Sequence, residues 1–117
     1  MRIDLGPLRQ LTGFVGAAVI DSETGLVLGQ LTADGRDLEI AAAGVTDVVR
    51  TARQLGLSLA PNDDLEDVFV SCGDQFHLAR TIGENPAILL YLWLDRRGAN
   101  FGLARLTLKQ VEEAIQL

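Results

Sequence analysis

Two segments of the chain are apolar on both sides of an extended strand. They are residues 14–20 and 87–94. Because alternate side chains of a strand point to opposite faces of a sheet, each segment must be covered on both faces. Each is also far shorter than the roughly 20 apolar residues that span a bilayer. The two segments therefore predict interior strands of a sheet that carries helices on both faces, without membrane insertion.

Periodicity and turn residues place the remaining elements around these two strands. Further strands are expected at residues 26–32, 68–72 and 75–82, and helices at 5–11, 38–55 and from Asn100 onward. Gly13 and Gly56 are expected to end the first two helices. The predicted order is α-β-β-α-β-β-β-α, with one five-stranded antiparallel sheet between helices. This is an α/β (α+β) three-layer sandwich, in which residues 1–117 form a single domain.

Charge and cysteine content limit the classes of partner and compartment. The chain carries 10 basic and 16 acidic side chains, a net charge of −6. No basic block is present in the sequence, which disfavours binding to nucleic acid. The only cysteine, Cys72, excludes an intrachain disulfide and is typical of a reducing compartment. Asp4 lies where a signal peptide needs an apolar stretch, so we expect a cytoplasmic protein.

The helix expected at residues 38–55 is apolar on more than one side. Its main stripe consists of Leu38, Ala41, Val45, Val48, Val49, Ala52 and Leu55. Ile40, Gly44 and Thr51 extend this stripe beyond the roughly 100° that a surface helix buries. Inside a helix, Gly44 also costs about 1 kcal/mol relative to alanine, a cost that close approach by a second backbone would offset. The pattern predicts a helix that is buried twice.

Three short segments share their order and spacing with a known family. They are the first hairpin at residues 15–28, the Ala-Ala-Ala-Gly run at 41–44 and the start of the last helix at 99–105. Together with the order of the elements, they resemble the roadblock / dynein light-chain domain family over nearly the whole chain. The segment 73–77, Gly-Asp-Gln-Phe-His, is more polar than the family pattern, and the first helix is shorter.

The resemblance implies a homodimer that is not an enzyme and needs no cofactor. In the family, two long helices lie side by side and the third strands of two sheets pair. The dimer interface expected from this arrangement and from the doubly apolar helix consists of Ile40, Gly44, Val48, Thr51, Val68 and Val70.

The resemblance also implies a partner, either a small Ras-like GTPase or an NTPase assembly. The phosphate-binding patterns Gly-x-x-x-x-Gly-Lys-Ser/Thr and Gly-x-Gly-x-x-Gly after a strand are absent from the sequence, so any GTPase would be a separate protein. The polar side of the long helix offers candidate partner-binding residues at Asp47, Arg50, Arg53 and Gln54. A solvated helix face is the alternative interpretation of the same residues.

Cys72 and His77 are the candidates for chemistry within the chain. They flank a tight turn and could form a nucleophilic pair or, with Asp74, bind zinc. The preferred interpretation is a buried cysteine beside a surface histidine. Two side chains on hairpin strands could face opposite sides, and zinc requires about four ligands where three at most are present. No metal site is therefore predicted.

Other charged segments leave alternatives open. An acidic loop contains Asp63, Asp64, Glu66 and Asp67. It lacks the glycine and the terminal glutamate of a calcium loop, so a solvated loop is the preferred interpretation. Arg96 and Arg97 are either an arginine finger toward a partner's phosphate or ordinary loop charges. The alternative function is a small-ligand sensor of profilin-like or GAF-like architecture, which needs an apolar pocket between sheet and helix.

Overall fold

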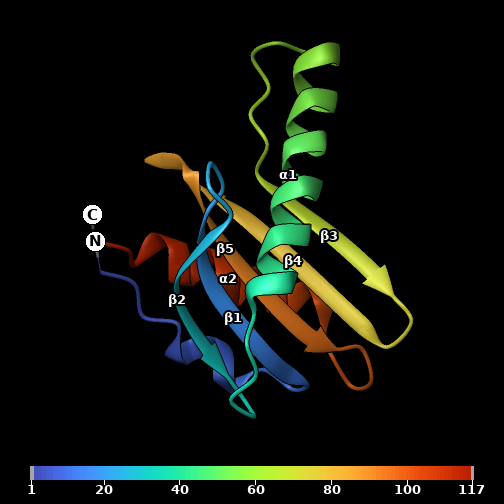
Figure 1. The fold of residues 1–117 in the computed structure, drawn as a ribbon. Coiled ribbons are helices and arrows are strands. Elements are labelled where there is room, and N and C mark those ends of the chain that lie inside the picture. The colour runs from blue at the N-terminus through green and yellow to red at the C-terminus, as the bar shows by residue number, and fades with distance from the viewer. Residues whose placement is uncertain (1, 117) are drawn as a thin grey trace.

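A computed structural model describes residues 2–116 and contains a five-stranded antiparallel sheet (Figure 1). The elements in chain order are the 3₁₀ helix η1 (Gly6–Gln10), β1 (Phe14–Asp21), β2 (Leu26–Thr32), α1 (Glu39–Leu59), β3 (Asp67–Cys72), β4 (Gln75–Ile82), β5 (Asn85–Asp95) and α2 (Phe101–Glu113). The strands lie side by side in the order β2-β1-β5-β4-β3. The two strands that are apolar on both sides, β1 and β5, therefore lie inside the sheet, as predicted, and they pair with each other.

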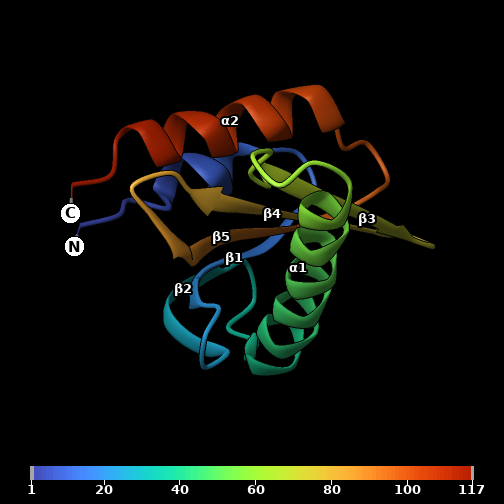
Figure 2. The same cartoon turned by 90° about the horizontal axis from the view of Figure 1, so that it is seen from above.

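Helices cover both faces of the sheet. Figure 2 shows α2 and η1 on one face and α1 on the other. The predicted three-layer α+β sandwich is confirmed, with the order β-β-α-β-β-β-α for its regular elements. The layers are held by two clusters of buried side chains, and β1 and β5 contribute to both clusters because they are apolar on both sides.

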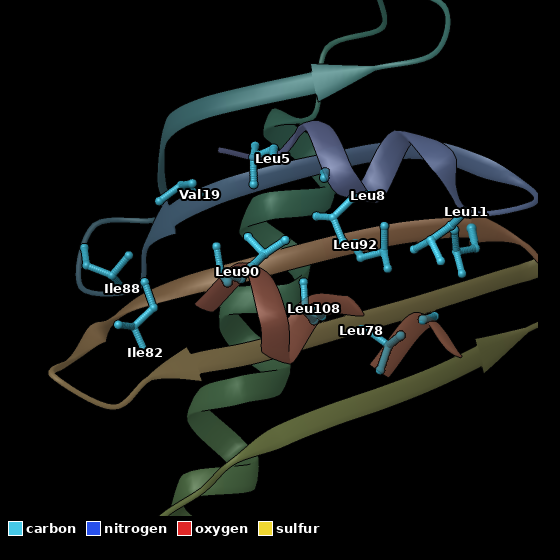
Figure 3. Packing of buried hydrophobic residues seen from close by; sticks show 14 residues of the cluster. Leu5, Leu8, Leu11, Val19, Leu78, Ile82, Ile88, Leu90, Leu92 and Leu108 are labelled. Carbon is cyan, nitrogen blue, oxygen red and sulfur yellow. The ribbon is translucent and has the colours of Figure 1, made fainter. Parts of the chain in front are cut away.

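Leucines dominate the cluster between the sheet and α2. Figure 3 shows this cluster, whose fully buried members include Leu8, Leu90, Leu92 and Leu108. The cluster between the sheet and α1 includes Ile20, Leu38, Val49, Leu89 and Tyr91. Full burial of a leucine-sized side chain contributes about 1.5 to 3 kcal/mol, so these clusters supply most of the driving force for folding.

The expected first α-helix is a 3₁₀ helix of five residues. Leu5, Leu8 and Leu11 are all buried, and their spacing of three matches the three residues per turn of a 3₁₀ helix rather than the 3.6 of an α-helix. The Asp4 carboxylate accepts a hydrogen bond from the Gly6 N–H, at 2.8 Å, just before the first turn. The prediction of an α-helix here was wrong, although the buried leucines were identified.

α1 runs to Leu59, past the Gly56 at which we expected it to end. Gly56 is accommodated within the helix, and the stop comes from Pro61 instead. A proline disfavours helical conformation at the residue before it, and Ala60 is extended, with φ −149° and ψ 98°.

The buried side of α1 also differs from the predicted main stripe. Ala42, Val45, Thr46 and Val49 are buried, whereas Val48 and Leu55 remain 39% and 62% exposed. The sequence pattern did not indicate Thr46 because it is polar, but its hydroxyl donates to the Ala42 carbonyl at 2.7 Å and so is satisfied inside the helix. Val48 and Leu55 therefore join the second apolar side of the helix rather than the first.

Candidate interface

An apolar stripe on α1 faces away from the rest of the chain. It consists of Ile40, Gly44, Val48, Thr51 and Leu55, and we call it the outer stripe. Ile40 is 91% exposed, and a Cβ atom added at Gly44 would meet nothing within 4 Å. Residues 2–116 therefore provide no neighbouring backbone that would explain a glycine at this place in the helix.

β3 lies at an edge of the sheet, with β4 as its neighbour among residues 2–116. Its outer edge presents backbone N–H and C=O groups on which another strand can add. Val68 packs against the cluster beneath α1, opposite Ala79 of β4, and Val70 lies on the same face opposite His77. The structure thus brings the expected strand residues to a free edge and beside the helix that carries the outer stripe.

Sequence reasoning missed an aromatic group on the opposite face of the same edge. Phe69 lies between Val68 and Val70, and its ring packs edge-on against Phe101 of α2 with centroids 4.3 Å apart. Both rings remain 40% exposed. The alternation of side chains along a strand could have indicated Phe69, because Phe69 is the apolar side chain that β3 directs toward α2.

The polar residues proposed for partner binding differ in their availability. Arg50 forms an exposed ion pair with Asp47 at 3.0 Å, and Gln54 is exposed. Arg53 is half-buried, and its guanidinium donates to the Pro86 carbonyl and to the Ser22 hydroxyl. Arg53 is thus committed to contacts within its own chain, while the other residues of this set remain open to solvent.

Cys72 and His77 lie on one face of the β3–β4 hairpin, because Cys72 pairs with Gln75 and Val70 pairs with His77. The expectation of a buried cysteine beside a surface histidine was wrong, since Cys72 is exposed and His77 is half-buried. The His77 Nδ1 lies 2.7 Å from the Tyr91 hydroxyl, and its Nε2 lies 2.8 Å from Gln75 Oε1. Both ring nitrogens are therefore engaged within the chain.

The surroundings of this histidine favour its neutral form. Burial lowers the pKa of the His77 imidazole and raises the pKa of the Tyr91 hydroxyl. Within residues 2–116, no three His, Cys, Asp or Glu side chains are grouped as metal ligands. When the neutral imidazole donates from Nε2 to Gln75 Oε1, its Nδ1 accepts a hydrogen bond from the Tyr91 hydroxyl, and all three groups are satisfied.

The acidic loop is only partly solvated, contrary to the sequence interpretation. Asp67 is the first residue of β3, and its carboxylate lies 2.7 Å from Arg105 of α2 and 3.3 Å from Arg80 of β4. Arg80 also pairs with Glu112 of α2. These side chains form an ion-pair network that ties the edge strand to the helix layer.

The two loop arginines also contact their own chain. Arg97 pairs with Asp95 at 2.7 Å and holds the pKa of that carboxyl at about 2. The Arg96 guanidinium lies over the Phe76 ring, 5.7 Å from its centroid. Nothing in these contacts aims either side chain at a phosphate site.

The fold is shared with roadblock domains of known structure. No protein-family model and no curated protein sequence matches the chain. The Roadblock/LC7 domain from Streptomyces avermitilis superposes with a TM-score of 0.81 at 16% identity, over 93% of this chain and 88% of that chain. Gliding protein MglB from Thermus thermophilus superposes with a TM-score of 0.75 at 25% identity, over 92% and 78%. MglC from Myxococcus xanthus superposes with a TM-score of 0.58 at 19% identity, over 93% of this chain and 92% of that chain.

The chain is therefore an α+β domain with the roadblock/LC7 fold, and the resemblance noted from its sequence is confirmed at the level of the fold. Among the structures with this fold, two structures of MglB have 25% sequence identity with this chain. Among residues 2–116, no helix is long and apolar enough to cross a membrane.

Proposed function

We propose that the chain forms a homodimer through α1 and β3, and that this dimer is a non-enzymatic regulator or scaffold for a small Ras-like GTPase or an NTPase assembly in the cytoplasm. The observation that carries the proposal is the outer stripe of α1 together with β3, a strand at the edge of the sheet. Burying a side chain such as Ile40 contributes about 1.5 to 3 kcal/mol, so a partner surface for this stripe is strongly favoured.

A second copy of the chain fits this surface. The glycine in the middle of the outer stripe allows a second helix to approach closely, and β3 can pair with a second β3 to extend the sheet. Two-fold symmetry uses the same patch on both copies, so one self-complementary surface is sufficient. Phe69 extends the proposed interface onto the α2 face of the edge.

The roadblock/LC7 fold and the likeness to MglB support a GTPase as the partner. The exposed Asp47, Arg50 and Gln54 are the proposed contacts, since they lie on α1 outside the core. The ligand-sensor alternative needs an apolar pocket between the sheet and a helix. The hollow between the second half of α1 and β4 is instead lined mainly by charged side chains, including Arg53, Arg80 and Glu112, which does not favour that alternative.

The dimer is tested by Gly44→Leu. An added side chain at this position has free space in the single chain, and leucine favours the helix more than glycine does, so the fold is expected to tolerate it. In the dimer the same side chain would keep the two helices apart. We expect the mass from light scattering to fall from that of two chains to that of one.

Leu26→Arg on β2 is the matched control, because Leu26 is as exposed as Leu55, at 62%, but lies at the opposite edge of the sheet. This variant should retain the mass of the wild type. A wild-type chain that is a monomer at micromolar concentration, or a Gly44→Leu variant with unchanged mass, would contradict the proposed interface.

The partner is tested with a Ras-like GTPase from the same source. Arg50→Glu is expected to weaken its capture by the immobilised dimer, whereas Lys109→Glu on the exposed side of α2 changes the charge equally and should not. Hydrolysis of bound GTP with and without the dimer then separates a regulator from a scaffold. Equal capture by both variants would remove α1 from the partner contact.

A further inference from the structure

One strip of the sheet lies on the same face as α1 but is not covered by it. The strip consists of Val70, Cys72, Gln75, His77 and Trp93, which are half-buried or exposed, and we call it the bare strip. Ala79 and Tyr91 on the same face are buried in the cluster beneath α1, and Val68 packs against that cluster, as does Trp93 at the border of the bare strip. α1 therefore covers the half of the β3–β4 pair that contains the start of β3, and leaves the half that contains its end.

The symmetry of the proposed dimer determines what comes to lie over the bare strip. Two copies of β3 pair antiparallel about a two-fold axis perpendicular to the sheet, which keeps both α1 helices on one face. The start of the partner's β3 then lies beside the end of this chain's β3. Because each α1 covers the start of its own β3, the partner's α1 is carried over the end of this one. Figure 1 also shows the last turns of α1 extending past β3, beyond the edge of the sheet, so the same turns of the partner's α1 extend past this chain's β3 to β4.

His77 is the titratable group of the bare strip that matters near neutral pH, and it is the only histidine of the chain. Tyr91 faces it from β5 and Cys72 lies on its face of β3. Asp34, Arg36 and Asp37, which belong to the loop before α1, line a hollow beside His77. Arg36 pairs with Asp34 at 2.6 Å and lies over the Trp93 ring, so the charge of that carboxylate is already matched.

We infer that the partner's α1 lies across the bare strip and buries His77, so that the dimer forms with neutral His77 and dissociates when this histidine is protonated. The inference rests on the proposed dimer and adds a regulatory property to it. An apolar helix laid over the imidazole removes water from it, and removal of water disfavours the charged form.

The direction of the pH effect follows from proton linkage. Dimerisation lowers the pKa of His77 further than partial burial in the single chain already does. A protomer that enters the dimer must therefore release a proton wherever its His77 is charged. The dissociation constant of the dimer is lowest above the pKa that His77 has in the single chain, and it rises as the pH falls below that pKa. With one His77 in each copy, the dissociation constant can rise by at most about a hundredfold per pH unit.

Sedimentation equilibrium of the full chain at about pH 7.5 and about pH 5.5 measures this effect. For the wild type we expect the dissociation constant of the dimer to rise at least about tenfold at the lower pH. For His77→Gln, which keeps a hydrogen-bonding side chain without a charge, we expect the same constant at both pH values. Far-UV circular dichroism of each sample checks that the chain stays folded.

The C2 proton of the only histidine gives an independent NMR readout. Its pKa should be lower in a concentrated, dimeric sample than in a dilute, monomeric one. Placing a histidine on α2, as Gln110→His in the His77→Gln variant, should not restore the pH dependence, since Gln110 is exposed away from the strip.

The possible failures are distinguishable. A wild-type chain that is monomeric at the higher pH overturns the dimer and the inference together. A dimer whose dissociation constant is the same at both pH values leaves the proposed function standing and overturns the inference. A pH dependence that persists in His77→Gln assigns it to other groups and overturns the inference as well.

Discussion

Gly13 illustrates how a single residue is fixed by its backbone surroundings. Its φ is +83°, and a Cβ atom there would lie 2.5 Å from the Asp95 carbonyl oxygen. The Gly13 carbonyl also accepts a hydrogen bond from the Asp95 N–H at 2.7 Å, where β1 begins beside the end of β5. The sequence predicted that Gly13 ends one element before the next begins. It could not predict the close approach of Asp95, because that depends on strands that are far apart in the chain.

Gly13→Ala is therefore expected to lower the free energy of unfolding by about 2 to 4 kcal/mol, since it combines an unfavourable φ with a backbone clash. Gly35→Ala separates the two effects. Gly35 has a similar φ of +77° but nothing within 4 Å of its added Cβ, so a loss of only about 1 kcal/mol is expected. Urea unfolding at one protomer concentration measures both. Equal losses would show that the contact with Asp95 is unimportant.

At the scale of elements, the ion-pair network has a structural role that local sequence could not reveal. Asp67 and Glu112 are far apart in sequence, and they meet through Arg80, whose side chain is only 13% exposed. Helical spacing on α2 contains no information about the sheet beneath the helix, so it could not place Glu112 beside Arg80. The same limit applies to α1, where Val48 was expected on the buried side and lies on the exposed one.

Arg80→Met is expected to lower the free energy of unfolding by about 1 to 3 kcal/mol, because it leaves Glu112 without its cation and Asp67 with Arg105 alone. Arg97→Met is the control. It removes a pair with Asp95 whose arginine side chain is 75% exposed, and about 0.5 kcal/mol or less is expected. If the two variants unfold at the same urea concentration, the network does not stabilise the fold.

At the scale of the whole molecule, the sequence predicted the sheet, its interior strands and its helix layers correctly, because all three follow from which residues must avoid water. The residues of the outer stripe other than Leu55 were proposed from the doubly apolar helix, and Val68 and Val70 from the resemblance to the roadblock family, whereas Phe69 was missed. What the sequence did not provide was the position of each group relative to distant elements. The hydrogen bond from Tyr91 to His77 joins two strands, and only their register brings it about.

The proposed dimer makes thermal stability depend on the amount of protein. Association stabilises the folded chain by mass action, so the Tm of the wild type should rise with protomer concentration. Gly44→Leu should remove this dependence and leave a Tm that is the same at every concentration. Calorimetry over about a hundredfold range of concentration measures both. A concentration-independent wild-type Tm would contradict coupled folding and association.

The free edge of β3 bears on whether the chain pairs with a copy of itself or with a related chain. Backbone groups are the same in every protein, so strand pairing alone does not distinguish a copy of this chain from a related one with an equally free edge. Discrimination must come from side chains, and in the proposed dimer the largest set is the outer stripe of α1. In a cell that makes several chains of this fold, the pattern from Ile40 to Leu55 would then determine which chains associate with one another. Exchanging that pattern between two such chains should exchange their partners while each sheet stays intact.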